Sequence, residues 1–340
     1  MELPTKEIVT GRKVFFIAPD TTLMPRSYLE DFFALGYECY YVEYDKREGF
    51  EKKVKAIINL FEDVLLFFNI DYHVPGVDWE ELIKSVSIEN DKKAFVGIYY
   101  ARRQSNEEKT YIEKKFMPLV GLGTGFVQLE YSKSKNIEIL EETLWSNQAQ
   151  GRRKTIRALC SATCTYTCMY EGSRENGVLQ DISLSHFSIV IPKDKMPVKL
   201  YEKIKDIHFN IQGLLFTSDA VLMMERETPT GRLCVFAFLN STGGNGLEQR
   251  IKLLLIPTLY KLLSTNVNLV IEHEIELLKT KEREAEEEKA RQEDQARERG
   301  KAQLQPDAGT PEGQAQTQAE AQAPAEPPAE AEDKDKGDAE

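Results

Sequence analysis

The chain has 340 residues, of which 41% are hydrophobic and 29% charged, with a formal net charge of −12. This length is enough for two ordinary domains with appendages, and an acidic chain without a recognition-helix motif argues against a nucleic-acid polymer as partner. No stretch approaches the roughly 18 to 20 apolar residues of a membrane span, and residues 1–13 are too polar for a signal peptide. We therefore expect a cytoplasmic protein without a membrane span.

The charge is unevenly distributed along the chain. Residues 301–340 hold ten acidic and three basic side chains, whereas residues 150–265 hold fifteen basic and ten acidic ones. A basic module inside an acidic protein favours an anionic ligand. Ordinary scatter of surface charge is the alternative that charge alone leaves open.

Residues 12–148 alternate between strand-like and helix-like patterns. The expected strands cover residues 13–19, 37–44, 63–70, 94–100 and 125–131. The expected helices cover residues 27–36, 50–61, 79–86, 107–120 and 137–145. Since parallel strands need helical crossovers, this order predicts an α/β doubly wound parallel sheet, in which ligands bind at the carboxyl ends of the strands.

At those ends the segment resembles a response-regulator receiver domain. The run DYHVPGVDWEELI begins at Asp71, which takes the position of the phosphate acceptor, and Lys133 takes that of the phosphate-pairing lysine. The family's paired acids after the first strand are reduced to Asp20, however, and Tyr100 replaces the small hydroxyl residue after the fourth. With too few carboxylates for Mg²⁺, the resemblance implies a degenerate receiver that acts as an interaction scaffold.

After Trp145 the pattern changes to short strands separated by Gly, Pro and Asn. Strands are expected at residues 156–170, 177–183, 185–192, 207–219, 220–228 and 231–240, with a hairpin turn at 228–232. A helix over residues 246–263, kinked at Pro257, follows. Many strands without intervening helices predict a small antiparallel β-barrel with a closing helix.

The five cysteines are not numerous or regular enough for a disulfide framework. They are Cys39, Cys160, Cys164, Cys168 and Cys234. Residues 156–170 alternate as one strand, along which four residues span about 13 Å, too far for ligands of one Zn²⁺. Structural thiols on one strand face are therefore the preferred interpretation, and no metal site is predicted.

Two polar stretches carry the functional signal of the barrel. GRRKTIR places Arg153 and Arg157 four residues apart at the entrance to the first strand, and QDISLSH places Asp181 and Ser183 on a later strand. An arginine fork takes phosphate oxygens bidentately and stacks on purines. A carboxylate accepts hydrogen bonds from the N–H donors of guanine, and a hydroxyl adds a further contact. Together these groups favour a phosphate-linked guanine ligand.

The two stretches resemble the PilZ domain, the bacterial receptor for cyclic di-GMP, whose pattern is R-x-x-x-R followed by D/N-x-S-x-x-G. Here the pattern reads RKTIR and DISLSH, and the resemblance covers residues 148–263. It implies a cyclic di-GMP site made of Arg152, Arg153, Arg157, Asp181 and Ser183, with the linker at Gly151 and Arg152 folding over the ligand. On binding, the flexible linker over residues 147–151 is expected to fold onto the barrel. The family's glycine is replaced by His186, whose side chain either clashes with the ligand or stacks on a guanine.

The last part of the chain becomes almost wholly charged. We expect a charged helix over residues 266–300, with a short dimer contact at Leu269, Ile271 and Leu278 as one alternative, and a disordered tail over 301–340. The preceding domains are then a receiver-like domain at 1–147 and a PilZ-like barrel at 148–265. The chain is expected to be a monomer or a dimer.

Signals of catalysis are missing from the sequence. The four histidines lack metal-binding spacing, and there is no P-loop, nucleophile elbow or dinucleotide-binding glycine pattern after a strand. We therefore predict a non-enzymatic cyclic di-GMP receptor, without a cofactor, that signals to a protein partner. The alternative is an adaptor that has lost its nucleotide and serves only as a protein-interaction scaffold.

Overall fold

The computed structural model describes residues 11–89, 94–103, 105–119, 125–193 and 195–302. Its first part is a five-stranded sheet in the order β2-β1-β3-β4-β5, with every pair parallel. The strands are β1 (Val14–Ala18), β2 (Cys39–Glu43), β3 (Val64–Asn69), β4 (Ala94–Ala101) and β5 (Phe126–Leu129). The predicted doubly wound sheet is confirmed.

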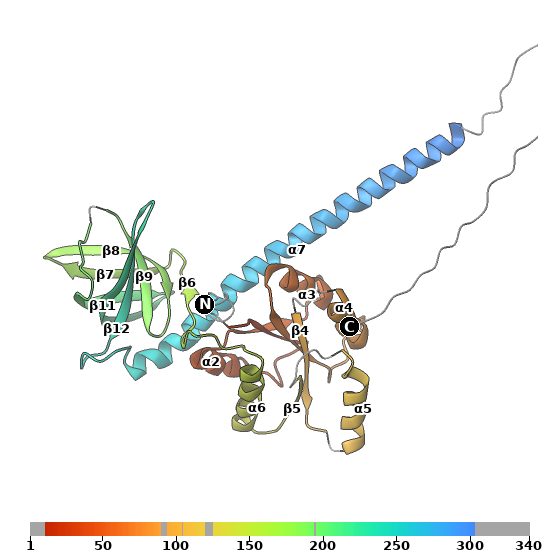
Figure 1. Cartoon of the computed structure of the whole chain (residues 1–340), viewed down its shortest axis with the longest axis horizontal. Coiled ribbons are helices and arrows are strands. Elements are labelled where there is room, and N and C mark those ends of the chain that lie inside the picture. The colour runs from red at the N-terminus through yellow and green to blue at the C-terminus, as the bar shows by residue number, and fades with distance from the viewer. Residues whose placement is uncertain (1–10, 90–93, 104, 120–124, 194, 303–340) are drawn as a thin grey trace, which may run out of the picture. The chain divides into compact units, whose positions relative to one another are not determined.

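Helices alternate with these strands along the chain. They are α2 (Arg26–Leu35), α3 (Gly49–Leu60), α4 (Trp79–Glu89), α5 (Asn106–Phe116) and α6 (Lys133–Ser146). Figure 1 shows α2 and α6 on one side of the sheet and α3, α4 and α5 on the other. Because both faces are covered, every residue of β1 and β3 is buried, which explains their unbroken apolar runs.

The second part is a small closed antiparallel barrel. Its strands are β6 (Ala158–Leu159), β7 (Cys164–Tyr170), β8 (Ser173–Ile182), β9 (His186–Ile191), β10 (Lys203–Ile211), β11 (Leu214–Thr228) and β12 (Gly231–Leu239). The order is β6-β8-β7-β10-β11-β12-β9, and pairing of β8 with β9 closes the barrel. Inside it, Phe187 packs against Phe209, Phe236 and Phe238 at ring-centroid distances of 5.0 to 5.2 Å. The predicted barrel is thus confirmed.

One predicted strand, over residues 207–219, is in fact a hairpin. β10 ends at Ile211 and β11 begins at Leu214, with φ values of 50° at Gln212 and 94° at Gly213. The Asn210 side-chain oxygen accepts a hydrogen bond from the Gly213 N–H at 2.9 Å. Two consecutive positive φ angles match the twist of a tight hairpin, so the turn interrupts an otherwise continuous apolar pattern.

The predicted strand over residues 156–170 is interrupted as well. A turn separates β6 from β7, and the Cys164 N–H donates to the Ser161 carbonyl at 3.0 Å. The four-residue step from Cys160 to Cys164 is therefore not an extended 13 Å step, and the two thiols lie within hydrogen-bonding reach of each other. Cys164 and Cys168 do share the inward face of β7. All five cysteines are free thiols.

A single long helix, α7 (Gln249–Ala302), follows the barrel, and Pro257 lies within it. The expected boundary at residue 265 therefore falls inside a continuous helix. The chain divides instead into compact units at residues 1–283 and 284–340. In the second unit, the described side chains of residues 284–296 are all exposed, as expected for a charged helix. The predicted disordered tail, apart from Lys301 and Ala302, lies outside the described residues.

Within the first unit α7 packs on the α/β domain. Tyr260 contacts Phe33 edge-to-face at 6.3 Å, and Lys279 forms an ion pair with Glu48 at 2.7 Å. Ile271 and Leu278 are only 6% and 7% exposed, whereas Leu269 is 58% exposed. Two of the three side chains considered for a dimer contact are thus covered by the same chain.

Among the described residues, α7 is the one helix long and apolar enough to cross a membrane. Core helices of soluble proteins have the same length and composition, so these two properties alone do not indicate a membrane span. The apolar side chains Leu255, Leu259, Leu262 and Leu263 are buried inside this chain. Leu253, Leu254 and Leu269 of the same helix are more than half exposed, so packing within the protein covers only part of its apolar surface.

Candidate ligand-binding site

The carboxyl edge of the parallel sheet holds the residues that resemble a receiver site. One carboxylate oxygen of Asp71 accepts from the Ala101 N–H at 2.6 Å, and the other pairs with Arg103. Burial raises the pKa of Asp71, and the bonds to Ala101 and Arg103 oppose that shift. Lys133 instead pairs with Asp31 at 2.9 Å. The Asp71 carboxylate is already satisfied, and the resemblance to a receiver domain is not confirmed.

No metal centre accompanies Asp71 in the part of the chain that the structure describes. Among those residues, no group of three or more His, Cys, Asp or Glu side chains is arranged to hold a metal ion. Asp20, the one acid left after β1, is exposed and accepts from the Thr22 N–H at 2.8 Å. Arg103 therefore supplies the positive charge beside Asp71.

The linker between the two folds is tied to the α/β domain. The Arg12 N–H donates to the Gln148 carbonyl at 3.2 Å, and the Gln150 side chain donates to the Leu35 carbonyl at 2.6 Å. Gly36, with φ of 93°, ends α2 so close to the linker that a Cβ there would lie 2.8 Å from the Lys154 carbonyl oxygen. The linker expected to be flexible is thus bonded to the α/β domain at Gln148 and Gln150, and Gly36 lies close to it at Lys154.

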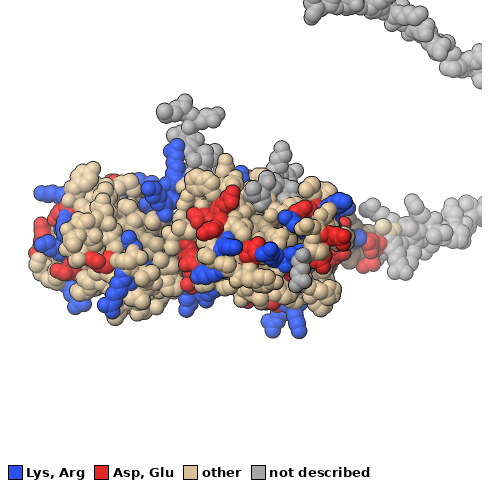
Figure 2. Space-filling view, turned by 90° about the horizontal axis from the view of Figure 1, so that it is seen from below, with Lys and Arg blue, Asp and Glu red and all other residues tan. Residues whose placement is uncertain are grey.

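The cationic segment begins where these anchors end. Arg152, Arg153 and Lys154 are exposed, and Arg157 is partly exposed. None of these four side chains forms a salt bridge or hydrogen bond with any residue that the structure describes. Elsewhere Lys and Arg alternate with Asp and Glu over the face drawn in Figure 2, and thirteen ion pairs link described residues, from Lys13–Glu38 to Arg291–Glu287. Four unpaired cations within six residues repel one another and attract an anion.

Strand pairing brings Asp181 next to this segment. β6 begins directly after Arg157, and its residues Ala158 and Leu159 pair with Ile182 and Asp181 of β8. The other edge of β8 pairs with β9, where Asp181 is opposite Ser188. The arginine motif and the Asp-x-Ser motif, 28 positions apart between Arg153 and Asp181, therefore meet in one sheet, as their resemblance to a single site requires.

Ser183 has a different environment from Asp181. Its side chain is 1% exposed, and its hydroxyl accepts from the His186 N–H at 3.0 Å and donates to the His186 carbonyl at 3.1 Å. These bonds close the tight turn between β8 and β9. The assignment of Ser183 to guanine recognition stays a prediction, but its hydroxyl already has its partners in this structure.

His186, in the position of the family's glycine, is held in place by hydroxyl groups. Its Nδ1 lies 2.8 Å from the Ser185 hydroxyl, which lies 2.8 Å from the Thr155 hydroxyl. Burial lowers the pKa of His186, and the nearby Arg157 guanidinium lowers it further. The imidazole is therefore neutral near pH 7 and adds no charge to the cationic segment.

This lowered pKa predicts a pH-dependent loss of stability. Between the ordinary value of 6.5 and the lower folded pKa, the unfolded chain binds a proton that the folded chain does not. The free energy of unfolding should therefore fall as the pH drops from about 7.5 to 5.5, and His186→Gln should reduce that fall. Urea denaturation of the unmodified protein and of His186→Gln at several pH values measures the free energy of unfolding. The same dependence on pH in both proteins would contradict a lowered pKa of His186.

A cavity of about 480 Å³ lies beside the two motifs. Thr155, Ser185 and His186 line it from the barrel side, and Gln249 and Lys252 line it from α7. The predicted arginines, Asp181 and Ser183 do not line it. Sequence reasoning missed Thr155 and Ser185, although both lie inside the quoted motifs, between the residues that the family pattern specifies.

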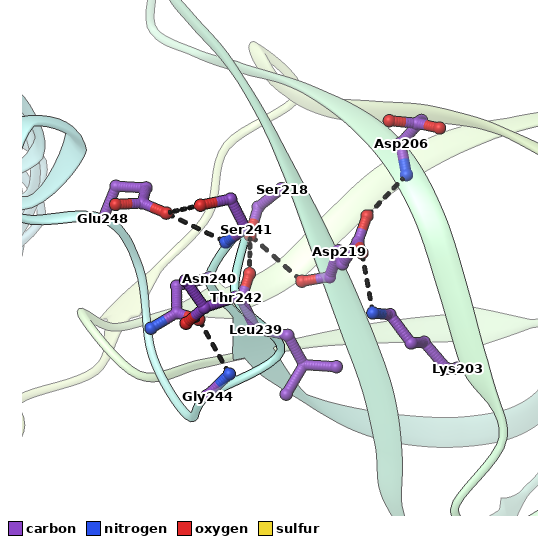
Figure 3. A network of polar contacts seen from close by, with 10 residues as sticks. All are labelled: Lys203, Asp206, Ser218, Asp219, Leu239, Asn240, Ser241, Thr242, Gly244 and Glu248. Carbon is purple, nitrogen blue, oxygen red and sulfur yellow. Dashed lines mark hydrogen bonds and ion pairs between the residues drawn. The ribbon is translucent and has the colours of Figure 1, made fainter.

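The loop that closes one side of this cavity is fixed by polar contacts (Figure 3). The Ser241 N–H and hydroxyl both donate to Glu248, at 2.9 and 2.6 Å, just before α7 begins. Asn240 accepts from the Gly244 N–H at 2.7 Å. Nearby, Ser218 donates to the Leu239 carbonyl at 3.0 Å. The end of β12 and the start of α7 are therefore held together beside the cavity.

Comparison with known proteins gives a limited likeness. No protein-family profile matches the chain, and no curated protein sequence is similar to it. Among solved structures, it is similar to YcgR in complex with c-di-GMP from Escherichia coli, with 19% identity over 39% of this chain and a TM-score of 0.26. It is also similar to the PilZ domain of YcgR with c-di-GMP, with 19% identity over 33% of this chain, 91% of that domain and a TM-score of 0.27. The chain spans about half, 51%, of the first structure's length.

Proposed function

We propose that this protein is a receptor for cyclic di-GMP, a binding protein rather than an enzyme. The observation that supports the proposal is the cluster of cations at residues 152–157, which have no acidic partner among the described residues and directly precede the strand that pairs with Asp181. The motif resemblance of these same residues to the PilZ domain supplies the identity of the ligand.

The chemistry of the ligand suits these groups. Cyclic di-GMP carries two phosphates and two guanines, so it offers anionic oxygens and N–H donors close together. Arg153 and Arg157 would bind phosphate through their planar forks and stack on guanine. Asp181, half-buried on β8, would accept hydrogen bonds from a guanine edge. Arg152 adds electrostatic attraction from the exposed end of the segment.

His186 then lies at the edge of the site as a neutral ring. It is half-buried, bonded to Ser185, and lines the cavity next to the motifs. A guanine that stacks on the imidazole would extend toward this cavity, and one that clashes with it would stay outside. Because the ring occupies space that a glycine would leave open, His186→Gly separates these two arrangements by the direction of the change in affinity.

We further propose that ligand binding is transmitted through the linker to a protein partner. The cationic segment continues directly from the linker that contacts Arg12, Leu35 and Gly36. A movement of the arginines toward a bound ligand would therefore shift the contacts that the linker makes with the α/β domain. The energy available for this shift is the difference in ligand affinity between the two arrangements.

Isothermal titration calorimetry of the full chain tests the receptor function. We expect saturable binding of cyclic di-GMP with a dissociation constant below roughly 10 µM, and no heat with GMP at the same concentration. The absence of binding at about 50 µM cyclic di-GMP would contradict the receptor function and favour the alternative, an adaptor that acts only as a protein-interaction scaffold.

A further inference from the structure

A second serine near Asp181 has a buried hydroxyl without a partner. Ser188 is 1% exposed, and its Oγ forms no hydrogen bond with the residues that the structure describes. Leaving a buried hydroxyl without a hydrogen bond costs about 1 to 3 kcal/mol. Such a group is uncommon inside a well-packed barrel, and it favours a role in binding a further hydrogen-bonding group.

The pairing of β9 places this hydroxyl on the outer face of the barrel. Phe187 and Ile189 point into the core, where Phe187 packs against other aromatic rings. Ser188, between them, must point outward, because side chains alternate along a strand. His186 shares its face two residues earlier.

On that outer face Ser188 is the immediate neighbour of Asp181. The two residues are directly opposite each other on β9 and β8, and Val235 of β12 is opposite Ser188 on its other side. Opposite residues of antiparallel strands have Cβ atoms about 4.5 to 5.5 Å apart. A single planar base can therefore contact the carboxylate of Asp181 and the hydroxyl of Ser188 together.

Ser183, the serine of the motif, differs from Ser188 in this respect. Its hydroxyl donates to the His186 carbonyl and accepts from the His186 and Ser185 N–H groups, so a bond to a ligand would have to replace one of the bonds that close the turn. Ser188 gains a bond without losing one. We infer that Ser188 is the hydroxyl that contacts the guanine held by Asp181, while Ser183 is a positioning residue that shapes the β8–β9 turn. This inference rests on the proposed function.

The ligand must reach a hydroxyl that is closed off in this structure. Asp181 and His186 are only partly buried, and they border Ser188 across and along the strands. A base that enters beside Asp181 would have to move the half-buried His186 ring, which shares this face of β9, to reach the Ser188 hydroxyl. The Ser188 contact would therefore strengthen when His186 is replaced by glycine.

Two alanine variants test this division of roles, with affinity measured by calorimetry and stability by thermal unfolding. Ser188→Ala should weaken cyclic di-GMP binding about five- to tenfold, as for one lost hydrogen bond, with an unfolding temperature that is unchanged or raised, because the variant removes a buried hydroxyl without a partner. Ser183→Ala should lower the unfolding temperature by several degrees, because it removes two bonds of the turn. In the His186→Gly background, Ser188→Ala should weaken binding at least as much.

The outcomes separate this inference from the proposed function. If the unmodified chain binds cyclic di-GMP and Ser188→Ala binds equally well at unchanged or higher stability, the role of Ser188 is wrong and the receptor function stands. Weaker binding accompanied by a lower unfolding temperature would also overturn the inference, because it would make Ser188 structural. If the unmodified chain does not bind, the receptor function and the Ser188 contact both fail.

Discussion

Replacing Arg157 with alanine is expected to weaken cyclic di-GMP binding by at least about 30-fold, which corresponds to the lower end of the roughly 2 to 5 kcal/mol lost when a charged contact loses one partner. Arg157 directly precedes β6, whose pairing with β8 places it beside the Asp181 strand. Its side chain has no acidic partner among the described residues, so the folded protein loses no ion pair in the variant. Calorimetry on the full chain measures the affinity.

Lys154→Ala is the matched control for this prediction. Lys154 belongs to the same cationic segment, is exposed and likewise forms no ion pair with described residues, but it stands at a position that the R-x-x-x-R pattern leaves unspecified. Removing Lys154 takes away one positive charge, as removing Arg157 does, but the lysine has no planar fork with which to bind phosphate. The affinity is therefore expected to fall only about two- to threefold in physiological salt. Equal losses for Arg157→Ala and Lys154→Ala would show that the segment attracts anions generally and does not form a specific phosphate site.

The main architecture was predictable because hydrophobic periodicity determines it. β1 and β3 are buried on both faces, and the sequence shows this as unbroken apolar runs. The hairpin at Gln212 and Gly213 was missed because the apolar pattern continues through it. The turn depends on the hydrogen bond that the Asn210 side chain accepts from the Gly213 N–H and on positive φ angles. Neither feature changes the hydrophobic pattern.

The assignment of Arg152, Arg153, Arg157, Asp181 and Ser183 to a ligand site stays a prediction. Their spacing in the sequence is recognisable, and strand pairing brings the residues that directly follow Arg157 beside Asp181. The sequence cannot distinguish a satisfied serine from an unsatisfied one, because that depends on which backbone groups lie nearby. Ser183 precedes β9 and closes a turn, whereas Ser188 lies on β9 and its hydroxyl has no hydrogen-bond partner among the described residues.

The apolar face of α7 shows a similar limit. Ile271 and Leu278 have the spacing of a helix-packing face, which fits a second copy of the chain as well as the chain's own α/β domain. The structure resolves the choice through contacts that are distant in sequence, such as Tyr260 with Phe33 and Lys279 with Glu48. Periodicity identifies a face that needs covering, but it does not identify what covers it.

Gly36→Ala is expected to destabilise the protein by at least about 2 kcal/mol and to weaken cyclic di-GMP binding. An alanine at a φ of 93° costs about 1 kcal/mol by itself. The added Cβ would also lie 2.8 Å from the Lys154 carbonyl oxygen, so the linker backbone must move. Since Lys154 lies between Arg153 and Arg157, that movement displaces the cationic segment. Urea denaturation measures the stability, and calorimetry measures an expected loss in affinity of about tenfold.

Gly172→Ala separates the strain of the backbone from the displacement of the linker. Gly172 also has a positive φ, of 80°, but a Cβ there would meet nothing within 4 Å. The Gly172→Ala variant should therefore lose only about 1 kcal/mol of its free energy of unfolding and none of its affinity for cyclic di-GMP. If both variants lose equal stability and bind alike, the contact between α2 and the linker does not position the arginines. A selective loss of affinity in Gly36→Ala would instead support the linker as the physical link between the α/β domain and the cationic segment, because Gly36 itself lies on the α/β side of that contact.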